Sequence, residues 1–345
     1  MLSIGPLGSS LGDTANGLGI PYREFTEKLM EHNPTSEVIS LTSGFSVRSL
    51  SRLGKAVLKC FLYGLRGDFV FLHLSWKSYK FFIIVLLPIL ILRPDNRIVI
   101  RKFAGDFDQR FRRLGRIGQW FFHTASKRAW FFFFETNYLV EWSNENFVRA
   151  HWWPNSRKVP ALTAKRVIGS KRCLVFMGRI CFDKGCERIL KIAELTSDDF
   201  DFRFYGPIDE SFKNRMLESS LPKNVSFHGR YAKSDIPKIL ASAFALLLPT
   251  SWKSEGYPGV IIEAAQVGVP SIVSSSRGPS ELIQLLQYGV IMDDFLSIDE
   301  FRLAIASLNE YCIGDARIRL AENARLLGND ETYSRVMNII GGKEC

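Results

Sequence analysis

The stretch "SWKSEGYPGVIIEAAQVGVPSIVS" (residues 251–274) decides how the second half of the chain folds. Pro258 suits the first turn of a helix, and Gly268 followed by Pro270 suits its end. The pattern therefore predicts a helix of about ten residues that begins at a glycine-bearing loop and leads into a strand.

Glu263 lies inside the apolar part of this expected helix, between two isoleucines and two alanines. An unpaired buried carboxylate costs several kcal/mol, so Glu263 needs a partner. One candidate is the vicinal diol of a ligand, whose two hydroxyls match two carboxylate oxygens. The other is a core arginine or a backbone amide. The start of the helix also suits an anion such as a diphosphate, because free N–H groups and the helix dipole point there.

Outward from this stretch, strand and helix patterns alternate through the second half of the chain. The expected strands are "CLVFMG", "FRFYG", "VSFHG", "AFALLLPT", "SIVSS" and "GVIMD". Three of them end on Gly178, Gly206 and Gly229, where glycine would let the backbone approach a ligand. Such alternation predicts a parallel sheet covered by helices.

The first half repeats this layout less sharply. After a glycine-rich loop and the helical pattern "PYREFTEKLMEH", the expected strands are "EVISL", "DFVFLHL", "NRIVIRKF" and "TNYLVE". Residues 81–92 are too short to cross a bilayer, which needs ~20 residues, so we expect a buried helix beside the sheet. Residues 151–166 have the proline and charge of a linker. With 345 residues the chain can form two domains.

The net charge of +10 belongs to the first half of the chain. Residues 1–160 hold 22 Lys/Arg against 12 Asp/Glu, and the remaining residues hold 23 of each (45 − 22 and 35 − 12). This asymmetry favours an anionic partner such as a phosphate-bearing substrate, a membrane surface or nucleic acid, although a basic soluble surface would look the same. Residues 110–134 mix basic residues with Trp and Phe, which suits either a lipid headgroup layer or a domain surface with a core strand. No nucleic-acid module accompanies them.

The six cysteines form no C-x-x-C pair, which favours neither a zinc site nor a disulfide framework and suits a reducing cytosol. The first residues lack the basic and apolar regions of a secretory signal. We therefore expect a cytoplasmic protein.

Several ordered motifs carry a resemblance to a known family. The segment "EGYPGVIIEAAQVGVPSIVSS" resembles the donor site of glycosyltransferase family 4, whose hallmark E-x7-E corresponds to Glu255 and Glu263. "FMGRICFDKG" is similar to the family's basic donor loop, with Arg179 and Lys184. "WPNS" is similar to its inter-domain Pro-Asn, and "NGLGIPYREFTEKL" more weakly resembles its N-terminal glycine loop. The strong similarity covers about residues 152–300.

The resemblance implies the GT-B architecture, an α/β fold with two Rossmann-like doubly wound parallel-sheet domains facing a central cleft. Residues 1–155 would bind the acceptor and residues 156–320 the nucleotide-sugar. Residues 321–345 would form a helical tail that packs back on the first domain.

The family pattern also implies site residues. Glu263 would hold the ribose diol, Glu255 the transferred sugar, and two cations the leaving diphosphate. Asp106 lies where relatives carry a histidine that faces the sugar, and His73 is a second candidate there, although a lone histidine is more often structural. The implied catalytic residues are Glu255, Arg179, Lys184 and Asp106, and the implied donor-binding residues are Glu263, Gly256, Tyr257, Pro258, Gly259, Gly206, Arg230, Gly17 and Gly19.

The implied function is a retaining, metal-independent transfer of a sugar from a nucleotide-diphospho-sugar. The expected acceptor is lipid-linked or a polysaccharide, as in bacterial lipopolysaccharide O-antigen, capsule or exopolysaccharide synthesis, at the inner face of the cytoplasmic membrane. A soluble small-molecule acceptor, or a non-catalytic nucleotide-sugar-binding subunit, are the alternatives. A nicotinamide oxidoreductase fits less well, because no dinucleotide fingerprint follows the first strand.

Overall fold

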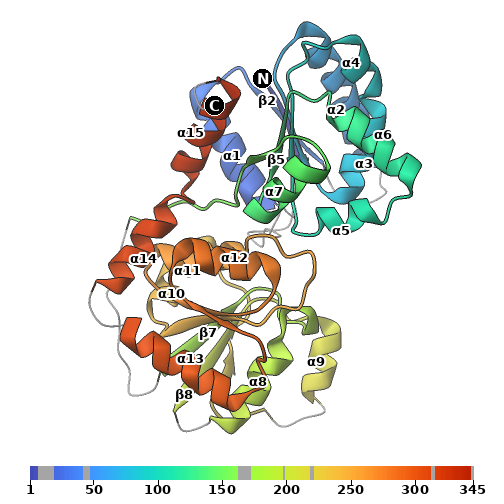
Figure 1. Cartoon of the computed structure of the whole chain (residues 1–345). Helices are drawn as coiled ribbons and strands as arrows, with labels where there is room; N and C mark the ends of the chain where they lie inside the picture. The colour runs from blue at the N-terminus through green and yellow to red at the C-terminus, as the bar shows by residue number, and fades with distance from the viewer. Residues whose placement is uncertain are drawn as a thin grey trace. The chain divides into compact units, whose positions relative to one another are not determined.

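The computed structural model describes residues 1–6, 19–41, 47–161, 172–196, 199–217, 221–311 and 315–342. Gly17 lies outside these ranges. The chain forms two compact units, one of Met1–Ser156 together with Asn329–Cys345 and the other of Arg157–Gly328 (Figure 1).

The first unit contains a six-stranded parallel sheet with the order β2-β1-β3-β4-β5-β6. Its strands are β1 (Leu2–Pro6), β2 (Glu37–Leu41), β3 (Val70–Leu74), β4 (Ile98–Lys102), β5 (Phe131–Phe134) and β6 (His151–Trp152). The start of the expected linker is thus an edge strand, because Phe133 and Phe134 pair in register with His151 and Trp152.

Helices cover both faces of this sheet. Successive residues of a strand point to opposite faces, so each central strand contributes to two cores. Phe71, Val99 and Phe133 form one core with α1 (Gly19–His32) and α15 (Asn329–Ile340). Leu72, Ile100 and Phe132 face the other core. The helices of that second face are α2 (Val47–Arg66), α3 (Trp76–Val85), α4 (Leu87–Leu92), α5 (Phe107–Arg112), α6 (Arg116–Ser126) and α7 (Asn137–Asn146).

Two expectations for the first half are wrong in detail. "TNYLVE" begins helix α7 instead of forming a strand, because the Thr136 side chain accepts a hydrogen bond from the Leu139 N–H (3.3 Å) and caps the helix. The strand lies just before it, in β5. Residues 81–92 form parts of two helices, α3 and α4, since Pro88 falls in the first turn of α4. Only part of that segment is buried, with Ile84, Ile91 and Leu92 exposed.

The second unit contains a parallel sheet with the order β12-β11-β10-β7-β8-β9. Its strands confirm the six predicted from the second half of the sequence: β7 (Arg172–Met177), β8 (Phe200–Tyr205), β9 (Val225–Phe227), β10 (Ala245–Leu248), β11 (Ser271–Ser274) and β12 (Val290–Met292). The helices are α8 (Cys186–Leu195), α9 (Glu210–Leu217), α10 (Ile236–Ala241), α11 (Gly259–Gln266), α12 (Arg277–Leu286), α13 (Ile298–Tyr311) and α14 (Ala316–Arg325), with short 3-10 turns at Phe182–Lys184 and Lys233–Asp235.

The last two helices belong to different units. Helix α14 packs on α11 and α12 of the second unit, where the Arg317 Nε donates to the Gly268 carbonyl (2.8 Å). Helix α15 packs on α1 of the first unit through ring contacts of Tyr333 with Phe25 and His32. The chain therefore returns to the first unit at Asn329 and not at residue 321. Among the residues that the structure describes, no helix is both long and apolar enough to span a bilayer.

Candidate functional site

The second sheet reverses its strand order between β7 and β10. From β7 the chain builds outward through β8 and β9, and from β10 it builds the other way through β11 and β12. In open α/β sheets ligands bind at the carboxyl ends of strands where the order reverses. The loops that follow β7 and β10 carry Arg179, Lys184 and Glu255, so the topology brings these predicted residues to one edge.

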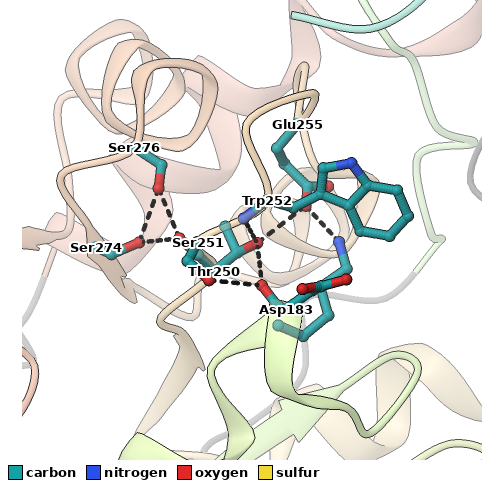
Figure 2. Close-up of polar contacts among 8 residues, drawn as sticks. Asp183, Thr250, Ser251, Trp252, Glu255, Ser274 and Ser276 are labelled. Atoms are coloured by element: carbon teal, nitrogen blue, oxygen red, sulfur yellow. Dashed lines mark hydrogen bonds and ion pairs between the residues drawn. The ribbon is translucent and has the colours of Figure 1, made fainter. Parts of the chain in front are cut away.

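Lys184 and Glu255 form an ion pair at this edge, between Nζ and Oε2. The Thr250 hydroxyl lies within hydrogen-bond distance of the same Glu255 oxygen (3.2 Å) and of the Asp183 carbonyl oxygen (3.2 Å), and Figure 2 shows it between the two. The Ser251 N–H also donates to the Asp183 carbonyl (2.9 Å). These contacts tie the loop after β7 to the loop after β10.

Trp252 is a site residue that the sequence analysis missed. Its N–H donates to the Thr250 hydroxyl oxygen (3.2 Å), and its indole ring lies 5.4 Å from the Arg179 guanidinium carbon and 5.3 Å from the Lys184 Nζ. Both predicted cations thus face one aromatic ring, an arrangement that favours cation–π attraction. Trp252 stands inside the stretch that predicted the fold, but no local pattern indicated that two cations from another loop would reach it.

Two serine hydroxyls hydrogen-bond to the backbone of the loop after β10. The hydroxyls of Ser274 and Ser276 both donate to the Thr250 carbonyl (2.6 Å each), and they lie 3.1 Å from one another (Figure 2). Ser274 ends β11 and Ser276 precedes α12. Because Thr250 is completely buried, these bonds fix the point from which Trp252 and Glu255 project.

Glu263 lies within α11, which starts after Pro258 and ends before Gly268, as the sequence predicts. Its Oε1 accepts a hydrogen bond from the Arg157 Nε (2.8 Å), and the two side chains are 18% and 6% exposed. The protein partner of this carboxylate is therefore an arginine, one of the two alternatives that the sequence left open. Arg157 is 106 residues away in sequence, so no local pattern pointed to it.

The Arg157 guanidinium also lies against the start of α11. A Cβ placed on Gly259 would overlap its Nη2 and Cζ atoms, so only glycine allows this approach. The half-buried Tyr231 lies near the same pair. Burial and the Glu263 charge raise the pKa of Tyr231 to about 12, against the opposing influence of Arg157. The ring is therefore a neutral phenol at physiological pH.

The other predicted donor residues have contacts inside the protein. The buried Tyr257 hydroxyl donates to Glu281 Oε1 on α12 (2.5 Å), and the Gly256 carbonyl lies where a Cβ on Gly278 would be. Gly206 has φ +138° and its N–H donates to the Gly229 carbonyl (2.7 Å). The group that lies close to Gly206 is the Gly178 carbonyl, and a Cβ on Gly206 would overlap its oxygen. Arg230, just after Gly229, is exposed.

The candidates of the first half lie in the first unit. Gly19 begins α1, and Gly17 is outside the described residues. Asp106 is buried before α5 and accepts a hydrogen bond from the Arg110 Nε (2.6 Å). His73 is buried among four aromatic side chains, with ring contacts to Tyr22, Phe25, Phe103 and Trp153.

Burial, followed by the nearby Arg101 charge, holds the pKa of His73 well below its ordinary value. A neutral ring packed in this way fits a core histidine. Within the described part of the chain, no group of three or more His, Cys, Asp or Glu side chains is placed to hold a metal ion.

Parts of this chain are similar to known sequences. Residues 161–327 match the family model for group 1 glycosyl transferases. The chain is 27% identical over 128 residues to a 2-deoxystreptamine N-acetyl-D-glucosaminyltransferase of Niallia circulans. That similarity covers 36% of this chain and spans about a third (32%) of the length of the curated relative.

Solved structures match over nearly the whole chain. HepE of Anabaena in complex with UDP superposes with a TM-score of 0.71 and 13% identity, covering 99% of both chains. The lipopolysaccharide outer core galactosyltransferase WaaB, in its apo form, superposes with a TM-score of 0.67 and 14% identity, also covering 99% of both. The family match of residues 161–327 supports a transferase enzyme, and the chain has the GT-B fold of glycosyltransferases.

Proposed function

We propose that the protein is a retaining glycosyltransferase whose second unit binds a nucleotide-diphospho-sugar at the switch point between β7 and β10. The observation that carries this proposal is the gathering of Lys184, Arg179 and Glu255 around Trp252 at that edge. Two cations and a carboxylate on loops at the carboxyl ends of parallel strands suit a substrate with a diphosphate and a hydroxyl-rich sugar.

The proposed reaction breaks the bond between the anomeric carbon and the diphosphate oxygen. The acceptor oxygen forms its bond to the same face of that carbon, and the departing phosphate oxygen takes the acceptor's proton. Negative charge grows on the diphosphate as it leaves, so Arg179 and Lys184 stabilise the transition state more than the ground state. The Lys184 ammonium has three donors and gives one to Glu255, which leaves donors for phosphate oxygens.

Glu263 is proposed to accept hydrogen bonds from the ribose hydroxyls. A carboxylate offers about four lone-pair sites, and the Arg157 Nε occupies one of them. The ion pair holds the carboxylate in place within α11, and the 18% exposure of the Glu263 side chain supports its contact with a ligand diol. The backbone around Gly256–Gly259, next to the start of α11, is proposed to meet the diphosphate or the sugar.

Uridine diphosphate is the first donor nucleotide to test, because HepE has been solved with UDP. Purified protein should slowly hydrolyse the correct UDP-sugar and lose that activity in Glu255→Gln, while Glu145→Gln, on the exposed part of α7, should keep it. A thermal-shift screen of UDP-, GDP- and ADP-sugars identifies the base, since a ligand that binds the native state raises its melting temperature. If no nucleotide-sugar shifts the melting temperature or is hydrolysed, the proposal fails.

For the acceptor we propose a lipid-linked or polysaccharide glycan of the bacterial cell surface, at the inner face of the cytoplasmic membrane. The +10 charge of the first half supports an anionic acceptor or membrane there, and the similar WaaB structure is named for the lipopolysaccharide outer core. The second candidate is a soluble acceptor, because the curated relative is named for 2-deoxystreptamine. Transfer of the sugar to water-soluble acceptors, with no increase in rate when lipid is added, would favour the soluble acceptor.

A further inference from the structure

Four helices of the first unit contain no acidic residue. Helices α2, α3, α4 and α6 hold no Asp or Glu, yet they carry eight basic residues: Arg48, Arg52, Lys55, Lys59, Arg66, Lys77, Lys80 and Arg116. The other long helices of the unit are different, since α1, α7 and α15 each contain at least two acidic residues. The positive charge of the first half is therefore concentrated on one group of helices.

These four helices form one continuous layer. Helix α2 packs on α4, α4 on α3, and α3 on α6, all on the sheet face of Leu72 and Ile100 (Figure 1). The contact between α2 and α4 is close, because a Cβ on Gly64 would lie 3.1 Å from Ile89. Since α1 and α15 cover the opposite face of the sheet, the outer surface of this layer faces away from that core.

The outer surface of the layer is rich in large apolar side chains. Ile117 and Trp120 on α6 are 84% and 67% exposed, and Leu92 on α4 is 72% exposed. Each helix contributes to the set, which consists of Leu58, Leu62, Leu65, Phe81, Ile84, Ile91, Leu92, Ile117 and Trp120. Several are spaced by three or four residues, which puts them on one side of their helix. Apolar side chains gathered in this way mark an interaction surface.

The combination of features selects an anionic lipid bilayer as the partner. Glu37 on β2 pairs with Lys55 (3.8 Å) and Lys59 (3.0 Å), and the other basic residues keep the layer positive. A second copy of the chain would bring two such basic surfaces together, which like charges oppose. A nucleic-acid backbone would match the cations but leave the leucines and isoleucines exposed. Apolar and tryptophan side chains among Lys and Arg suit the boundary between headgroups and acyl chains.

We infer that the outer surface of α2, α3, α4 and α6 lies on an anionic membrane, with Ile117 and Trp120 inserted among the headgroups. This inference rests on the proposed membrane-bound acceptor and names the surface that would hold the enzyme there. It places the membrane contact on the first unit, whereas Arg179, Lys184, Glu255 and Glu263 belong to the second unit.

The test is flotation of the full chain with vesicles of phosphatidylglycerol and phosphatidylcholine, against vesicles of phosphatidylcholine alone. The protein should bind the anionic vesicles, and added salt should weaken the binding. The double variant Ile117→Ser/Trp120→Ser should bind about tenfold or more weakly, because two exposed apolar side chains lose their burial in lipid. The matched control Leu195→Ser/Ile318→Ser changes two exposed apolar residues of the second unit and should bind like the wild type.

Absence of binding to anionic vesicles at low salt would overturn the inference and favour an acidic protein as the partner. Equal binding by the Ile117/Trp120 variant, or loss of binding in the control variant, would also overturn it. Hydrolysis of the nucleotide-sugar without vesicles separates this result from the transferase proposal. Both variants should hydrolyse at the wild-type rate. Vesicle binding without hydrolysis would contradict the transferase alone, and hydrolysis without vesicle binding would contradict the membrane surface alone.

Discussion

Removal of the Arg157 guanidinium tests what holds Glu263 inside α11. Arg157→Leu deletes the donor that lies 2.8 Å from Oε1 and leaves a carboxylate that is only 18% exposed. Removing one partner of a buried ion pair costs ~3–5 kcal/mol. Because Glu263 keeps some contact with water, we expect about 3 kcal/mol, near the lower end of that range. For a unit of this size the melting temperature should fall by roughly 6–12 °C.

A double variant separates the structural partner from the ligand. Arg157→Leu/Glu263→Leu removes both charges, and replacing a buried pair with apolar residues is often neutral. The double variant should therefore regain most of the stability that Arg157→Leu loses. A hydrogen bond to a charged group contributes ~1.5–3 kcal/mol, so loss of the carboxylate should weaken UDP binding at least about tenfold. Thermal unfolding by circular dichroism and calorimetric titration with UDP measure the two effects independently.

Two results would refute this reasoning. An unchanged melting temperature in Arg157→Leu would mean that the ion pair does not stabilise the fold. UDP binding by the stable double variant with wild-type affinity would mean that Glu263 serves only Arg157 and does not bind the ribose. Wild-type protein should gain about 2.7 kcal/mol of stability at a UDP concentration one hundred times its Kd, which provides the reference signal.

Three further predictions test other parts of the molecule. Trp252→Ala should lower kcat/KM on the order of tenfold, since cation–π contacts contribute ~0.5–2 kcal/mol each, and Trp252→Phe should keep most of the activity in the hydrolysis assay. Gly206→Ala should destabilise the second unit by about 3 kcal/mol in urea unfolding, because its Cβ would overlap the Gly178 carbonyl at φ +138°. The control Gly229→Ala has space around its Cβ and should cost only ~1 kcal/mol at φ +70°. Burial lowers the pKa of Lys102 to about 7 from an ordinary 10.5, so the unfolded chain binds more protons between these values and stability should rise as pH increases from about 7 to about 10. Urea midpoints at pH 7 and pH 9 should show this rise in the wild type, and Lys102→Met should reduce it.

Local sequence patterns predicted the second unit well because its elements obey local rules. Six apolar runs bounded by turn residues became six strands, and Pro258 and Gly268 bounded α11 as expected. The same rules failed at "TNYLVE", where aromatic and β-branched residues resemble a strand but the Thr136 side chain caps a helix. The real strand is the run of four phenylalanines just before it, whose lack of alternation hid its boundary.

The partners of the site residues depend on topology, which a local pattern does not contain. Lys184 and Glu255 are 71 residues apart, and they meet because the strand order reverses between β7 and β10. The resemblance to a family placed both residues in one site, but composition and spacing alone would not have paired them. Trp252 was missed for the same reason, since the two cations that face it come from the loop after β7.

The contacts of Glu263 follow the rule that a buried charge needs a partner. Arg157 meets that need within the protein. The rule does not state that there is a single partner, because one carboxylate accepts several hydrogen bonds and Arg157 Nε takes one at Oε1. An arginine that fixes the carboxylate beside the start of α11 reduces the freedom that a ribose diol would otherwise have to remove on binding. Arg157 and a ribose diol can therefore both bind Glu263. Melting temperature and UDP affinity of the Arg157→Leu/Glu263→Leu variant separate the two roles of this carboxylate.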